Sequence, residues 1–136
     1  MTTPTIALPT TPLWTPRILS IFRIVIGLLF LSHGVVKLWG FPAGVQPGQV
    51  PLLGLYGLAG VLEFFGGGAV MLGLFTRPVA FILSGEMAVA YCMAHLPQSV
   101  FPLVNMGEDA ILFCFGFLYL AFAGGGAWSV DAARKA

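Results

Sequence analysis

The residues of this sequence most able to do chemistry are acids, bases and one amide that lie inside or beside long apolar segments. Acids and bases are costly in hydrocarbon, so we expect these side chains to face other helices rather than lipid. Histidine and carboxyl groups are common proton donors and acceptors. The pattern therefore predicts a site in an apolar interior where protons are exchanged or a polar guest is bound. Its candidate residues are His33, Lys37, Glu63, Glu86, His95, Asn105, Glu108 and Asp109.

The first apolar segment organises the rest of the chain. Residues 18–39 have the length of a membrane-spanning helix, because a rise of about 1.5 Å per residue covers roughly the 30 Å of a bilayer's hydrocarbon core. Its polar residues and two glycines fall within an arc of about 120° on a helical wheel. That arc should face other helices, and it holds Arg23, Gly27, His33, Gly34 and Lys37.

Composition places the chain in a membrane. Of its 136 residues 58% are hydrophobic and only 8% are charged, with a mean hydropathy of +0.96. Soluble domains carry about 25% charged residues. A net charge of +1 gives no basic surface for nucleic acid.

Hydropathy and the loop residues divide the chain into four helices. We predict an all-α bundle of four transmembrane helices, a polytopic membrane protein, with helices at about 18–39, 52–75, 79–95 and 105–123. Residues 1–16 form a flexible tail, 17–123 the membrane domain and 124–136 a C-terminal tail. The first apolar run lacks the features of a signal peptide and is expected to be retained. Arg17, Arg77, Arg134 and Lys135 fall on one side of such a bundle, which predicts cytoplasmic termini.

Counting residues from the cytoplasmic helix ends predicts two polar layers. Arg23 and Glu86 form an inner pair at about 9 and 12 Å, which we interpret as a structural ion pair. The outer cluster lies at about 18 to 30 Å. It holds His33, Lys37, Glu63, His95, Glu108 and Asp109.

Charge counting favours a functional role for this cluster. Four carboxyl groups share the interior with only two permanent cations, Arg23 and Lys37. Their excess negative charge must therefore be removed by protonation of a carboxyl group, or balanced by a protonated histidine or a bound cation. Glu86 and His95 lie about half a turn out of phase, so an ideal helix cannot direct both to one point. Lys37 paired with Glu108 or Asp109 is the structural alternative.

Neither metal nor disulfide chemistry is expected. His33, Glu63, Glu108 and His95 are suitable ligand types, but they lack compact ligand spacing. Cys92 and Cys114 form no C-x-x-C pair, and we interpret them as buried bystander thiols.

Several stretches resemble the DoxX family over nearly all of residues 17–131. RIVIGLLFLSHGVVKLWG resembles the family's opening motif, and LAGVLEFFGGGAVMLGLFTRPVA its second. GEMAVAYCMAHL, NMGEDAILF and GGGAWSVD resemble its later motifs. The motif positions fall on Arg23, His33, Lys37, Glu63, Arg77, Glu86, His95, Asn105, Glu108, Ser129 and Asp131.

The resemblance implies a small protein of the bacterial or archaeal inner membrane with a link to redox work. Family members are associated with thiosulfate:quinone oxidoreductase and with membrane oxidoreductase complexes. Partners would then be the lipid bilayer and membrane or soluble oxidoreductase subunits, and the sequence also leaves a homo-oligomer open.

Our first functional hypothesis is an oxidoreductase subunit with an intramembrane pocket for a quinone or quinol. His33 and Glu63 would act as the catalytic acid and base, exchanging protons with the ring oxygens. The substrate-binding groups would be Lys37, Glu86, His95, Asn105, Glu108 and Asp109. Two alternatives use the same residues: a transport or binding module for a cation or small solute, and a structural or assembly subunit.

Overall fold

The computed structural model describes residues 13–135, and within them the chain is helical and has no strand. The long helices are α1 (Trp14–Trp39), α2 (Leu55–Leu72), α3 (Thr76–Ala90) and α5 (Glu108–Ala123). A π-helical turn, η1 (Tyr91–His95), extends α3, and two short helices complete the chain, α4 (Pro102–Asn105) and α6 (Val130–Ala133). Residues 1–12 of the expected N-terminal tail lie outside the described residues.

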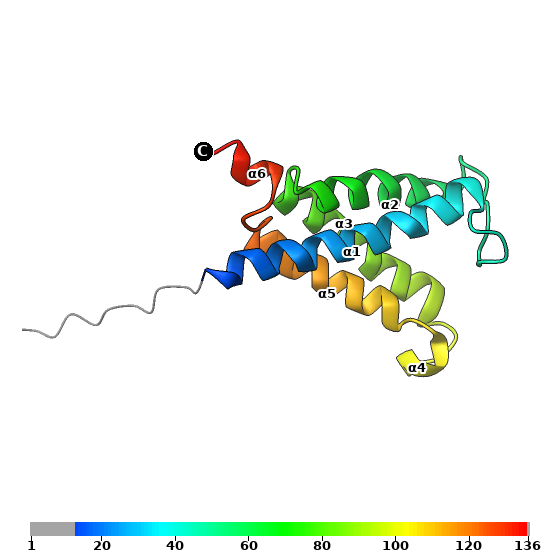
Figure 1. Ribbon diagram of the computed structural model, residues 1–136. Helices are drawn as coiled ribbons and strands as arrows, with labels where there is room; N and C mark the ends of the chain where they lie inside the picture. The colour runs from blue at the N-terminus through cyan, green and yellow to red at the C-terminus, as the bar shows by residue number, and fades with distance from the viewer. Residues whose placement is uncertain (1–12, 136) are drawn as a thin grey trace, which may run out of the picture.

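Helices α1 and α2 pack against each other through glycines (Figure 1). A Cβ atom on Gly27 would lie 2.6 Å from the backbone nitrogen of Met71, and one on Gly34 would lie 2.5 Å from that of Phe64. Only glycine allows the two backbones this approach. The prediction that the arc holding Gly27 and Gly34 faces another helix is confirmed.

The second extensive contact joins α3 to α5, and aromatic rings fill the space between this pair and α1. The ring of Phe30 lies 4.7 Å from that of Phe117 and 5.1 Å from that of Phe113, measured between centroids. The Phe30–Phe117 pair is edge-to-face, an arrangement that adds to the stabilisation from burial. The apolar core comprises Ile26, Phe30, Val70, Ala80, Leu83, Met87, Ala110, Phe117 and Leu120.

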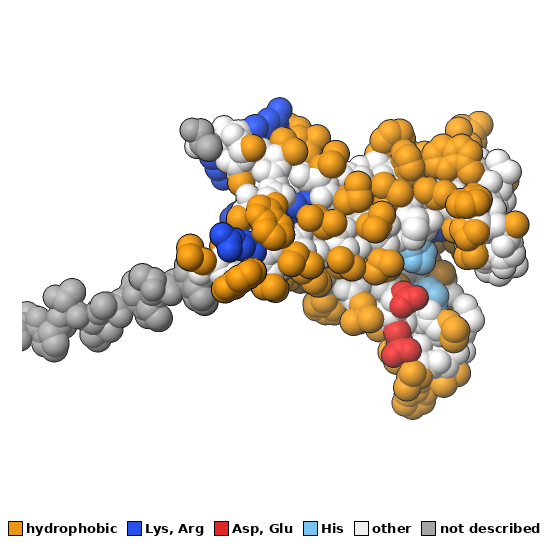
Figure 2. Space-filling view, in the orientation of Figure 1, with side chains coloured by type: hydrophobic (Ala, Val, Ile, Leu, Met, Phe, Trp, Pro, Cys, Tyr) orange, Lys and Arg blue, Asp and Glu red, His pale blue; other side chains and the backbone are white. Residues whose placement is uncertain are grey.

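The C-terminal segment folds back against the end of the bundle where α1 begins. The Ala127 N–H donates to the Pro16 carbonyl at 3.1 Å, and the Asp131 N–H donates to the Gly73 carbonyl at 2.9 Å. Helix α6 and the start of α1 therefore lie at one end, and α4 lies at the other (Figure 1). Arg17, Arg77, Arg134 and Lys135 belong to the first of these ends, where the blue side chains gather in Figure 2.

Three of the helical segments, Trp14–Trp39, Leu55–Leu72 and Thr76–His95, are long and apolar enough to cross a membrane. Many of their large apolar side chains are exposed on the outside of the bundle, as lipid contact requires (Figure 2). Helix α5 has 16 residues and rises about 24 Å. The chain is thus a membrane protein of packed apolar helices.

The helix bounds differ from the expected ones mainly at the ends. Helix α1 begins at Trp14, four residues before the expected start, and α5 begins at Glu108, three residues after the expected start of the fourth helix, because α4 ends at Asn105. Met106 between them has a positive φ of 57°, which ends α4. The π turn widens the end of α3 and shifts the phase of His95 relative to Glu86.

Candidate functional site

Arg23 is completely buried and anchors the C-terminal segment to the end of α2. Its Nε donates to the Gly125 carbonyl at 2.7 Å, and its Nη2 to the Trp128 carbonyl at 2.6 Å. Its Nη1 donates to the carbonyls of Val70, at 2.6 Å, and Met71. Val70 and Met71 belong to the last turn of α2, where carbonyls lack partners within the helix and the helix dipole favours a cation.

The ion pair expected between Arg23 and Glu86 is not formed. Helix α1 begins nine residues before Arg23, and Arg23 lies level with the last turn of α2. Glu86 lies ten residues beyond Thr76, the start of α3, which places it about 15 Å farther into the bundle. Backbone carbonyls therefore satisfy the guanidinium in place of a carboxylate.

Lys37 and Glu63 form a buried ion pair between α1 and α2. The Lys37 Nζ donates to Glu63 Oε1, and the two side chains are 14% and 2% exposed. A Cβ on Gly60 would lie 2.9 Å from the Lys37 Cβ, so the lysine stem runs over the glycine face of α2, one turn before Glu63. Close packing of α1 on α2 thereby brings the ammonium to the carboxylate.

Glu86 of α3 completes a cluster that we call the carboxyl cluster, consisting of Lys37, Glu63 and Glu86. Glu86 lies close enough to Glu63 and Lys37 for their charges to interact. Within residues 13–135, three buried carboxyl oxygens have no hydrogen-bond partner: Glu63 Oε2 and both oxygens of Glu86. With both carboxyls ionised the cluster carries one uncompensated negative charge, which is costly in a low-dielectric interior. A single proton or monovalent cation would neutralise it.

His33 lies apart from Glu63, on the side of α1 that faces α5. Its ring meets the Phe113 ring edge-to-face at 5.6 Å, and its side chain is exposed on the bundle surface. It is near enough to Lys37 and Asp109 for charge interaction. Figure 2 shows histidine and acidic side chains close together on this face. The two predicted catalytic residues therefore have different neighbours: Glu63 is bonded to Lys37, and His33 packs against Phe113.

The remaining members of the predicted site hold the loop between η1 and α5. Asn105 is buried; its Nδ2 donates to the Ser99 carbonyl at 2.7 Å, and its Oδ1 accepts from the Gly107 N–H at 2.8 Å. His95 Nδ1 donates to the Asn105 carbonyl at 2.8 Å, and the His95 ring stacks on that of Tyr91. His95 and Asn105 thus direct their polar atoms to the loop rather than to the carboxyl cluster.

Glu108 and Asp109 lie in the first turn of α5, and both are exposed. Acidic residues there complement the positive end of the helix dipole. The ion pair considered between Lys37 and one of these acids is not formed, because the Lys37 Nζ is bonded to Glu63 of α2.

Asp131, a motif position without a predicted role, caps α3 from the C-terminal segment. Its two carboxylate oxygens accept from the backbone N–H groups of Phe75 and Thr76, each at 2.8 Å. Partial burial alone would raise the pKa of Asp131, but these hydrogen bonds, aided by Arg134, hold it below its ordinary value. Because Phe75 and Asp131 are 56 residues apart in sequence, helix periodicity could not reveal the cap.

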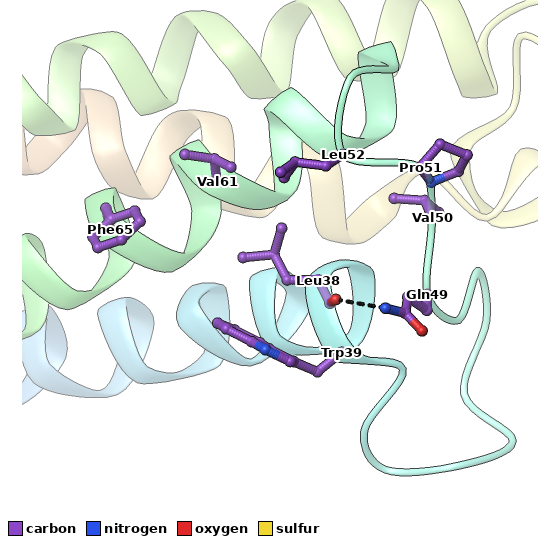
Figure 3. A pocket seen from close by; sticks show the side chains of 8 residues that line it. All are labelled: Leu38, Trp39, Gln49, Val50, Pro51, Leu52, Val61 and Phe65. Carbon is purple, nitrogen blue, oxygen red and sulfur yellow. Dashed lines mark hydrogen bonds between the residues drawn. The ribbon is translucent and has the colours of Figure 1, made fainter.

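One groove has no residue of the carboxyl cluster in its lining. It has a volume of about 810 Å³ and is bounded by the end of α1, the following loop and the start of α2 (Figure 3). Its lining is mostly apolar, with Gln49 bonded to the Leu38 carbonyl at 3.2 Å. It brings no acid or base to a ligand.

Metal and cysteine chemistry have no structural support in the described part of the chain. No group of three His, Cys, Asp or Glu side chains there could hold a metal ion. Cys92 and Cys114 are free thiols; Cys114 is half-buried, whereas Cys92 is exposed, unlike the buried thiol expected from the sequence.

Comparison with known proteins agrees with the resemblance seen in the motifs. The DoxX family profile matches residues 18–96. The chain is 40% identical to an uncharacterized protein of Haemophilus influenzae over 126 residues, covering 87% of this chain and 91% of the other. It is 34% identical to the inner membrane protein YqjF of Escherichia coli (80% and 85% covered), and 28% identical to an uncharacterized membrane protein of Mycobacterium tuberculosis (85% and 80% covered). No solved structure matches the chain.

Proposed function

The chain belongs to the DoxX family of membrane proteins, and we propose that it serves there as a proton-binding subunit whose carboxyl cluster holds one exchangeable proton. The observation that carries this proposal is the set of three buried carboxyl oxygens without hydrogen-bond partners, beside the single cation Lys37. One proton makes the cluster neutral.

The neighbouring ionisable groups supply a route for that proton. Asp109 and His33 lie near each other at the surface, His33 lies near Lys37, and Lys37 is bonded to Glu63. A proton that passed along these groups would travel from the first turn of α5 to the buried carboxyl group of Glu86. At the other end of the bundle, Arg23 and the C-terminal segment close the interior.

The membrane setting follows from the same arrangement. We propose four crossings, with α5 as the fourth, and both termini in the cytoplasm, because the basic residues outside the bundle gather at the end where α1 begins. The similarity to an inner membrane protein of Escherichia coli supports the bacterial inner membrane as its location.

Proton exchange can be tested with the chain reconstituted in lipid. A protonated carboxyl gives an infrared carbonyl band that shifts when deuterium replaces the proton. We expect this shift in the unaltered chain within the mixing time of the buffer, and a much slower shift in His33→Phe. Ser32→Ala, an exposed neighbour on α1, is the matched control and should exchange at the unaltered rate. Equal rates in all three proteins would remove His33 from the route.

A quinone or quinol is the second candidate, and the exposure of His33 beside the Phe113 ring favours it. Here the headgroup would lie on the outside of the bundle, with an oxygen bonded to the imidazole and its ring against aromatic carbon. Glu63 would receive the proton rather than touch the ligand, because it is 2% exposed. Oxidoreductase partner subunits would have to carry the electrons.

The quinone proposal has its own test. Protein purified from native membranes should retain quinone in the unaltered and Ser32→Ala forms and lose most of it in His33→Ala. If His33→Ala retained as much quinone as the unaltered chain, this residue would be excluded from quinone binding. The proton proposal is tested separately, by the infrared measurement.

A further inference from the structure

A second groove lies at the basic end of the bundle, between the start of α1 and the end of α5. It has a volume of about 420 Å³. We call it the Trp14 groove. Its lining residues are Trp14, Thr15, Ile18, Leu19, Phe22 and Tyr119.

The groove changes from polar to apolar along the bundle axis. Arg17 lies beside its rim, with the guanidinium carbon 5.2 Å from the centre of the Trp14 ring. Arg17 precedes Arg23 by six residues, so it lies about 9 Å outside the level of the last α2 turn. Ile18 and Phe22 continue from this rim toward the membrane interior, and Phe22 meets the Tyr119 ring edge-to-face at 6.1 Å.

The charge around the groove has one sign. The end of the bundle that carries it has four basic residues outside the core, Arg17, Arg77, Arg134 and Lys135, and a single acid, Asp131. The carboxylate of Asp131 is bonded to backbone N–H groups of Phe75 and Thr76. Excess positive charge therefore faces any molecule at the rim (Figure 2).

We propose that the Trp14 groove binds an anionic phospholipid, with the phosphate beside Arg17 and an acyl chain along Ile18, Leu19 and Phe22. The groove is lined by apolar side chains where an acyl chain would lie, and a guanidinium stands where the headgroup would lie. A guanidinium favours phosphate through paired hydrogen bonds and charge. Trp14 and Tyr119 are the aromatic residue types that populate the membrane interface.

The test is native mass spectrometry of the full chain, purified in detergent and mixed with equal amounts of phosphatidylglycerol and phosphatidylcholine. We expect the unaltered chain to retain phosphatidylglycerol preferentially. Arg17→Gln should reduce this retention about fivefold, the effect of one basic residue near an anionic lipid surface. Lys135→Gln removes an exposed charge from the same end and should change it less than twofold.

A second variant tests the groove independently of charge. Ile18→Trp fills the apolar part of the groove while Arg17 is kept, and we expect it to lose bound phosphatidylglycerol although its helix content by circular dichroism is unchanged. Equal losses in Arg17→Gln and Lys135→Gln would overturn the proposal in favour of diffuse attraction. Equal retention of both lipids would also overturn it, as would a lipid-free dimer, which would assign the groove to a second copy of the chain.

Discussion

Replacing Lys37 with methionine removes the one cation of the carboxyl cluster and should destabilise the protein in a pH-dependent way. The stem of Lys37 packs over Gly60, so methionine fills similar space and the change is mainly one of charge. Glu63 would then be buried without a partner at either oxygen. Breaking a buried pair in this manner costs about 3 to 5 kcal/mol.

Protonation sets an upper limit to that cost. A buried carboxyl without its cation can become neutral by taking up a proton. For a group with an ordinary pKa of about 4.3, this costs about 3.7 kcal/mol at pH 7 and about 1.4 kcal/mol less for each pH unit below it. We therefore expect Lys37→Met to lower the free energy of unfolding by about 3 to 4 kcal/mol at pH 7 and by about 1 kcal/mol at pH 5.

The assay is reversible unfolding in mixed micelles, followed by circular dichroism between pH 5 and pH 8. Lys135→Met, which removes an exposed lysine, is the matched control and should stay within about 0.5 kcal/mol of the unaltered chain. The double variant Lys37→Met with Glu63→Gln should recover most of the loss at pH 7, because the lone charge is gone. A loss in Lys37→Met that is the same at every pH would refute the charge argument.

Three further predictions concern the packing and the ends of the bundle. Gly34→Val should cost about 1 to 3 kcal/mol or more in micelle unfolding, because its Cβ would lie 2.5 Å from a backbone atom of α2. Gly68→Ala, whose Cβ would meet only a leucine methyl at 3.6 Å, should be tolerated, and equal losses would contradict the close contact. Arg23→Met should cost about 3 kcal/mol and expose the C-terminal segment to protease, since buried carbonyls lose their donors; a protected segment would argue against the anchor. The Asp131 cap stabilises fully above the ordinary pKa of that group and is lost as the pH falls through its lower pKa in the folded protein. Asp131→Asn should therefore remove an acid-sensitive part of the stability below about pH 4, and identical acid unfolding curves would exclude this role.

The sequence predicted the parts of the fold that depend on periodicity. Apolar run lengths located the long helices, and the arc that holds Gly27 and Gly34 predicted the face of α1 that packs on α2. These features repeat along one helix, so a wheel reveals them. The bounds were less accurate, because turns such as the one at Met106 depend on single backbone conformations.

The partners of the buried charges could not be obtained in the same way. Arg23 binds four backbone carbonyls, and carbonyls are present at every position of any sequence. The helices also begin at different levels, because α1 extends about nine residues beyond the last turn of α2, where Arg23 lies. For that reason, depth counted along each helix pairs Glu86 with Arg23 instead of placing it beside Lys37 and Glu63.

The central claim is that Lys37, Glu63 and Glu86 together hold one proton at neutral pH. The most direct measurement is the infrared spectrum of the chain in lipid bilayers at pH 7, compared with that of Glu86→Gln. The account predicts a protonated-carboxyl band in the unaltered chain that is absent in the variant and does not diminish when sodium or potassium is added. A spectrum with no such band, or a band that disappears as the cation concentration rises, would contradict it.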